Sequence, residues 1–151
     1  MASIPLQSLE DFSPYEPLHQ IQMTRELTLT SEPIVESSWV ASRHVSPSSG
    51  ACVWFQGSVR DTEEGAPIRG IQYEAYDAMA RHQFHKIFDQ IEGRWPIHSI
   101  RLIHRIGAVS VGQPSIWVEV TSAHRAEAFA ACQFLIEEMK QRVPIWKHAL
   151  P

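Results

Sequence analysis

The pattern of hydrophobic and polar residues predicts several β-strands along the chain. In 51–57 and 97–106, hydrophobic side chains occupy every second position, which places them on one face of an extended strand. A polar loop at 58–67 holds a glycine and a proline and brings the chain back for another strand. The strands are expected at 21–29, 51–57, 68–75, 97–106 and 116–120.

Longer segments have the spacing of an amphipathic α-helix. Hydrophobic residues in 76–91 recur every three or four positions, and Gly93 and Pro96 are expected to end this helix. A second long helix is expected to begin with Ser122 as its N-cap and to end before Pro144, because proline disfavours a helical conformation in the residue before it. Its predicted apolar stripe consists of Phe129, Cys132, Ile136, Met139 and Val143.

The other segments complete a prediction of the fold class. A short helix is expected within 31–43, with Ser31 as its N-cap. Residues 107–114 are predicted to form a turn, and the tail 145–151 is assigned no regular element. Short strands, hairpin-length loops and two long helices in this order predict an α+β fold with helices packed on a mostly antiparallel sheet.

Composition narrows the class of protein. With 151 residues, of which 44% are hydrophobic, the chain can form one domain over 21–151, preceded by a flexible lead-in over 1–20. No apolar run approaches the roughly 18 residues that span a bilayer, and the N-terminal residues resemble neither a signal peptide nor a transit peptide. Cys52 and Cys132 are too few for a disulfide framework and are expected to be buried. These features predict a cytoplasmic protein without a membrane segment.

The net charge argues against nucleic-acid binding, and the spacing of the histidines argues against a metal site. A formal net charge of −4 argues against nucleic-acid binding, although local cations can still hold a small anion. His82 and His85 share a helix face, but no third ligand is spaced to complete a metal site, so none is predicted. His104 lies on the apolar face of its strand and is expected to be a core or interface histidine.

The start of the second long helix is a candidate anion site. If Ser122 caps the helix, then Ala123, His124 and Arg125 occupy its first turn, where backbone N–H groups lack acceptors and the helix dipole is positive. Cationic side chains are unfavourable there, which favours a bound anion such as a phosphate. The alternative is that both cations simply point into solvent.

Cations also gather at the ends of other predicted elements. Lys140, Arg142 and Lys147 lie at the end of the second long helix and just beyond it, where they can hold an anion or exchange protons. The alternative is a solvated basic C-terminus that the helix dipole favours. Arg60 follows the strand at 51–57 and can bind a phosphate or carboxylate, or else pair with an acidic neighbour.

Four segments in this order resemble one family. FQGSVRD, YEAYDAMA, IHRIGAVSVGQPSIWVEVTSAHRAEAF and LIEEMKQRVPIWK are similar to the large, catalytic subunit of molybdopterin synthase, the MoaE family. The resemblance implies an α/β-hammerhead-type fold and a homodimer. It also implies that each end of the dimer binds a small ubiquitin-like sulfur carrier with a C-terminal Gly-Gly thiocarboxylate, giving a heterotetramer.

The resemblance also implies a reaction and its residues. Sulfur passes from the carrier to cyclic pyranopterin monophosphate, forming the molybdopterin dithiolene, with no metal or organic cofactor. Lys140 and Lys147 are implied as the catalytic residues. The residues implied to bind the substrate are Arg60, Ser58, Val59, His124 and Arg125, of which the last two come from across the dimer interface. The alternative hypothesis is a non-catalytic, dimeric anion-binding paralogue of the same fold.

Overall fold

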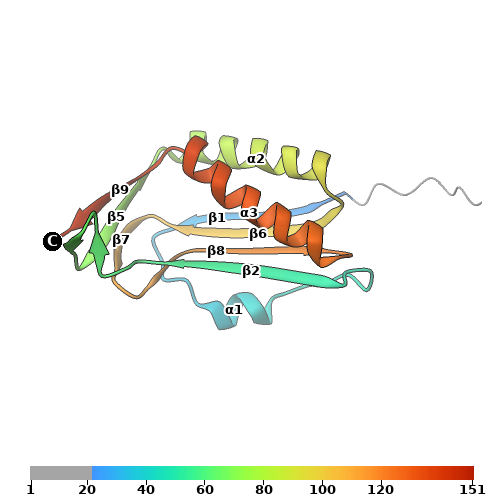
Figure 1. The fold of residues 1–151 in the computed structure, drawn as a ribbon, viewed down its shortest axis with the longest axis horizontal. Helices are drawn as coiled ribbons and strands as arrows, with labels where there is room; N and C mark the ends of the chain where they lie inside the picture. The colour runs from blue at the N-terminus through green and yellow to red at the C-terminus, as the bar shows by residue number, and fades with distance from the viewer. Residues whose placement is uncertain (1–21) are drawn as a thin grey trace, which may run out of the picture.

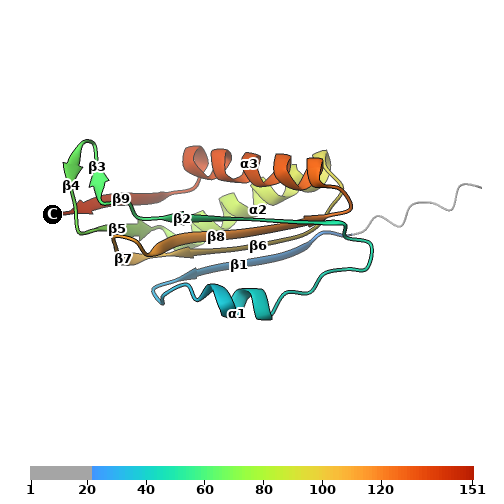
Figure 2. The same cartoon turned by 60° about the horizontal axis from the view of Figure 1, so that its bottom comes forward.

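A central sheet organises the computed structural model, which describes residues 22–151; the predicted lead-in over 1–20 lies outside the described residues. The sheet has four strands in the order β1-β6-β8-β2. The long helices α2 and α3 cover one face, and the short helix α1 lies against the other (Figures 1 and 2). The strands of this sheet are β1 (Thr24–Thr30), β2 (Ala51–Ser58), β6 (Ile97–Arg105) and β8 (Pro114–Ser122), and the helices are α1 (Glu36–Ala41), α2 (Asp77–Arg94) and α3 (Arg125–Arg142).

The predicted α+β class with a mostly antiparallel sheet is confirmed. Strands β2 and β6 both run antiparallel to β8, whereas β1 runs parallel to β6. Alternation along the strands places apolar side chains on both faces of the sheet, which separates two clusters. Leu102 and Val118 face the long helices, and their neighbours Ile103 and Trp117 belong to a separate cluster beside α1.

A smaller sheet extends beyond one end of the central sheet (Figure 1). In it, β5 (Gly70–Ala75) pairs antiparallel with β7 (Gly107–Ser110) on one side and with β9 (Ile145–Leu150) on the other. A hairpin of β3 (Thr62–Glu63) and β4 (Ala66–Pro67) lies next to it. The turn predicted at 107–114 is therefore confined to 111–113, because 107–110 form β7, and the tail at 145–151, which was assigned no regular element, forms β9. Both segments lack a clear alternation of their own, and β5 supplies the pairing that makes them strands.

The main core lies between the central sheet and the long helices. The predicted apolar face of α2 is confirmed for Phe84, Ile87, Phe88 and Ile91, which are fully buried, and each such side chain contributes about 1.5–3 kcal/mol. At the start of the predicted face, Tyr76 and Met79 are exposed. The stripe predicted for α3 was partly wrong, because Phe129 is 61% exposed. Cys132 of the predicted stripe is buried, and the other buried residues of α3 are Ala128, Ala131 and Leu135, whose small members let the helix lie close to the sheet.

The structure also differs from the predictions at several helix boundaries and in the exposure of one cysteine. Helix α1 begins at Glu36 rather than after Ser31, and no side chain caps it. Ser122 is not an N-cap, because it is still part of β8 and pairs there with Ala51. Gly93 lies inside α2, which ends one residue later. Cys52 is exposed on β2, so the prediction that both cysteines are buried holds only for the other one.

Candidate active site

A cavity of about 490 Å³ opens where the C-terminal end of α3 meets the smaller sheet. Its walls come from segments that are far apart in the sequence: β2, β5, β6, β8, α3 and β9. Both predicted catalytic residues, Lys140 and Lys147, line it. The other lining residues are Phe55, Gly57, Ser58, Tyr73, His104, Ser115, Ile116, Ile136, Met139, Val143 and Ile145. An apolar interior with a few cationic groups is the usual character of a small-molecule site.

Pro144 brings the two lysines together. It forces Val143 out of the helical conformation, to φ −84° and ψ 124°, so α3 stops and the chain enters β9. Strand β9 then pairs with β5, which places Lys147 opposite Tyr73. Because side chains alternate along a strand, Lys147 and Ile145 point into the cavity while Trp146 lies on the other face.

An acidic residue connects Lys147 with Arg60. The ammonium of Lys147 donates to the carboxylate of Glu63 in β3, and the guanidinium of Arg60 lies 4.0 Å from the other oxygen of the same carboxylate. The hydrogen bond from Lys147 lowers the pKa of Glu63. The sequence offered pairing with an acidic neighbour as the alternative for Arg60, and the structure identifies that neighbour as Glu63. The structure adds its contact with Lys147, which depends on the unpredicted strands β3 and β9.

Ser58 and Val59 are adjacent in sequence but differ in position. Ser58 lines the cavity at the end of β2, where the pairing with β8 shifts register after Gly57. Val59 is buried in a small cluster outside the cavity lining, and its backbone N–H donates to the carbonyl of Gln113 at 3.0 Å. A role of either residue in substrate binding stays a prediction.

His104 also lines the cavity, and the sequence alone did not indicate that it belongs to this site. It is 5% exposed, and burial lowers its pKa. Its Nδ1 lies 2.7 Å from the carbonyl oxygen of Arg105, and its ring meets Tyr73 edge-on with centroids 5.3 Å apart. The expectation of a buried, hydrogen-bonded histidine is confirmed. The signal that places it in the site is the pairing of β5 with β9.

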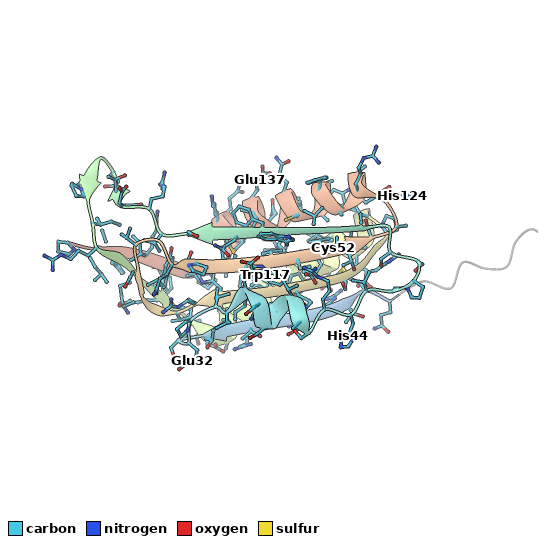
Figure 3. The ribbon with its side chains drawn as sticks, turned by 90° about the horizontal axis from the view of Figure 1, so that it is seen from below. Glu32, His44, Cys52, Trp117, His124 and Glu137 are labelled. Atoms are coloured by element: carbon cyan, nitrogen blue, oxygen red, sulfur yellow. The ribbon has the colours of Figure 1, made fainter. Side chains whose placement is uncertain are left out.

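His124 and Arg125 lie at the opposite end of α3 from the cavity. At about 1.5 Å of rise per residue, Arg125 and Lys140 are separated by about 22 Å along the helix axis. Figure 3 shows His124 at this far end, beyond Glu137. His124 is the N-cap residue rather than part of the first turn, and it makes no capping hydrogen bond through its side chain. Within the described part of one chain, these two residues do not join the lysines.

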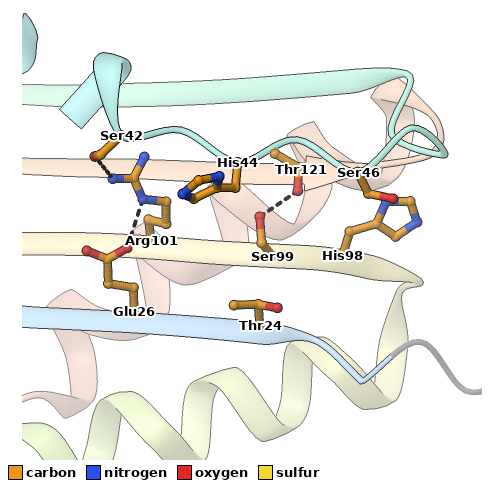
Figure 4. A pocket seen from close by; sticks show the side chains of 9 residues that line it. All are labelled: Thr24, Glu26, Ser42, His44, Ser46, His98, Ser99, Arg101 and Thr121. Carbon is orange, nitrogen blue, oxygen red and sulfur yellow. Dashed lines mark hydrogen bonds and ion pairs between the residues drawn. The ribbon is translucent and has the colours of Figure 1, made fainter. Parts of the chain in front are cut away.

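A second, smaller cavity of about 170 Å³ lies on the α1 side of the central sheet (Figure 4). Its polar side chains are largely paired with each other. Ser99 and Thr121 share a hydrogen bond of 2.6 Å, and Arg101 donates to Glu26 at 2.9 Å and to Ser42 at 2.7 Å. This pairing leaves less unused cationic charge for an anion than the cavity at Lys140 and Lys147 offers.

Among residues 22–151, no group of three or more His, Cys, Asp or Glu side chains is arranged to hold a metal ion. No helix in the same range has the length and apolar character needed to cross a bilayer.

The fold and the cavity together define an α+β protein with a cationic pocket suited to a small anionic ligand. A family model described as MoaE protein matches residues 29–142 of the chain. This match covers well over half of the sequence, and the chain belongs to the MoaE family.

The relatives and solved structures that this chain resembles support the same family assignment. The molybdopterin synthase catalytic subunit of Arabidopsis thaliana is 44% identical over 101 residues, which are 67% of this chain and 51% of that protein. The chain thus spans about half the length of this plant relative. The catalytic subunit of Thermoplasma volcanium is 41% identical over 67% of this chain and 74% of its own. The X-ray structure of molybdopterin synthase from Staphylococcus aureus matches with a TM-score of 0.73 and 32% identity, covering 83% of this chain and 89% of that one.

Proposed function

We propose that this protein is the catalytic subunit of a molybdopterin synthase, acting as one domain over 21–151. It transfers sulfur from a thiocarboxylated carrier protein to cyclic pyranopterin monophosphate, a step of molybdenum cofactor biosynthesis. The observation that carries the proposal is the convergence of Lys140 and Lys147 on one cavity, with Arg60 tied to it through Glu63. The family and the names of the relatives support the same activity.

The cavity suits both anionic reactants. A Gly-Gly tail has no side chains and needs little space to enter the cavity, where the ammonium groups of Lys140 and Lys147 stabilise its terminal thiocarboxylate. Arg60, whose guanidinium side chain is 79% exposed, is available for the substrate phosphate together with Ser58. The apolar walls strengthen these charge interactions by excluding water.

The proposed reaction begins when the thiocarboxylate sulfur attacks the pterin side chain and the cyclic phosphate opens. The lysine ammonium groups stabilise the negative charge that develops on the leaving oxygen. The carrier is then joined to the substrate through a thioester, which water cleaves to release the carrier as a carboxylate. A second carrier delivers the second sulfur and completes the dithiolene.

The geometry of α3 supports a homodimer. His124 and Arg125 are too far from Lys140 to reach the same substrate within one chain, so a second copy supplies them to the cavity. A structure from Helicobacter pylori, described as a complex of subunits 1 and 2 of molybdopterin-converting factor, has the same fold with a TM-score of 0.64. A small carrier subunit at each end completes the proposed heterotetramer. The free cysteines Cys52 and Cys132 are consistent with the reducing cytoplasm, where we place the protein.

The test combines the purified protein with cyclic pyranopterin monophosphate and a ubiquitin-like carrier whose C-terminal Gly-Gly has been converted to a thiocarboxylate. Formation of the dithiolene product, followed by mass spectrometry, is expected only with the thiocarboxylated carrier. The unmodified carboxylate form is the control. If both reactants bind but no sulfur is transferred, the protein is the non-catalytic anion-binding paralogue, and the proposed activity is refuted.

A further inference from the structure

His104 is a buried titratable group in the cavity that the reaction described above does not use. It lies on β6, with its side chain on the face covered by α2 and α3, and lines the same cavity as Lys140 and Lys147. Only 5% of the residue is exposed. A histidine that is held rigidly beside the two lysines is positioned to take part in the chemistry.

The hydrogen bond to Arg105 fixes which ring nitrogen carries the proton. The carbonyl oxygen of Arg105 can only accept, so Nδ1 of His104 is the protonated donor at 2.7 Å. Burial lowers the pKa of His104, which keeps the ring neutral at physiological pH. Nε2 therefore carries a free lone pair. It has no hydrogen-bond partner among residues 22–151 and is not among the polar atoms sealed from solvent there.

The other polar groups of the cavity are poor proton acceptors. Tyr73 faces His104 from β5, Lys140 faces the cavity from α3, and Lys147 does so from β9. Lysine ammonium groups have three donors and no lone pair, and a tyrosine or serine hydroxyl is only a weak base. Glu63 lies at the rim and is held by Lys147. Among the lining side chains of the described chain, His104 is thus the group suited to accept a proton at neutral pH.

We propose that His104 is the general base that releases the carrier after each sulfur transfer. This inference rests on the proposed function, in which a thioester joins carrier and substrate. Nε2 of His104 removes a proton from a water molecule while the water oxygen forms a bond to the thioester carbonyl carbon. The carbon–sulfur bond then breaks, and its electron pair leaves with the substrate sulfur as a thiolate beside the lysine ammonium groups. The carrier leaves as a carboxylic acid that ionises to the carboxylate and gives the second proton of the water to solvent, and His104 also returns its proton to solvent.

The substitution His104→Asn separates catalysis from structure. The asparagine amide lies where Nδ1 was and can still donate to the carbonyl of Arg105, but no base remains at the position of Nε2. General-base catalysis contributes roughly 10²–10⁴-fold, so carrier release is expected to slow by about this factor. Because the earlier sulfur attack is intact, intact-protein mass spectrometry is expected to detect the carrier–substrate thioester accumulating. His98→Asn is the matched control, since His98 is also a buried histidine with a hydrogen bond but lines the other cavity.

The pH dependence gives a second readout that a purely structural role would not change. Because burial holds the pKa of His104 below the roughly 6.5 of an ordinary histidine, carrier release by the wild type is expected to slow only at a pH more acidic than that, where His104 becomes protonated. This acidic limb is expected to be absent from His104→Asn, or from His104→Gln if the asparagine variant does not fold. Unchanged release with the same pH profile, or slow release without thioester accumulation, overturns the inference. If the wild type itself transfers no sulfur, the proposed function fails and this inference fails with it.

Discussion

Replacement of Lys140 by alanine tests the cationic cavity most directly. Lys140 is exposed at the cavity and forms no ion pair or side-chain hydrogen bond with the residues of 22–151, so its loss costs the fold about 0.5 kcal/mol or less. Loss of one preorganised donor to a developing negative charge costs about 2.7–4 kcal/mol, or roughly 10²–10³ in rate. Sulfur transfer is therefore expected to fall at least about 100-fold while the Tm changes by only a few degrees.

The assay is single-turnover formation of the sulfurated product with the thiocarboxylated carrier, read beside thermal unfolding of the same samples. Gln141→Ala is the matched control, because Gln141 is the next exposed residue of α3 and does not line the cavity. Lys140→Arg retains the positive charge and is expected to recover part of the rate. Turnover of Lys140→Ala equal to that of the wild type would refute the reasoning, as would a loss of activity that merely follows a loss of folded protein.

Other predictions concern the neighbouring charges, the buried histidine and the core. Glu63→Gln removes the carboxylate that holds Lys147, and tighter binding of a Gly-Gly carboxylate carrier is expected by calorimetry; weaker binding would contradict the geometry. The folded protein keeps the pKa of His104 below the roughly 6.5 of an unfolded histidine, so the unfolded chain takes up the proton first. The free energy of unfolding from urea titrations is therefore expected to be full above about pH 6.5 and to fall below it, and this part of the pH dependence is expected to vanish in His104→Asn. Phe84→Ala opens the core beneath α2 and is expected to cost about 3–5 kcal/mol in the same titration; a cost below 1 kcal/mol, as for a surface residue, would contradict its burial.

The sequence predicted the central sheet and the long helices because their pattern is local. Alternation along β6 and the helical spacing of α2 each arise from one buried face, so a single segment contains the whole signal. Prediction from the sequence failed for strands whose pairing partners are distant along the chain. Strand β9 has mostly exposed residues and becomes regular only through its hydrogen bonds to β5.

The site was predicted only in part, because some of its contacts depend on pairing between strands that are distant in the sequence. Lys140 and Lys147 were named from the motif, and the structure places both in one cavity. The link through Glu63 and the position of His104 depend on β3, β5 and β9, whose pairings join residues that are dozens of positions apart. For His124 and Arg125, the distance along α3 explains why the pattern of one chain alone does not bring them to the lysines.

The break at Pro144 also limits how this chain can vary in length. Lys140 is positioned by a helix, but Lys147 is positioned by the two-residue repeat of a strand that starts just after the proline. Inserting or deleting a single residue between Pro144 and Lys147 would exchange the two faces of β9, turning the ammonium outward and Trp146 inward. A change of two residues would keep Lys147 on the face of β9 that lines the cavity. Natural variants of this connection are therefore expected to differ by even numbers of residues. An even change in length keeps each side chain on its face of the strand, whereas an odd change moves it to the other face.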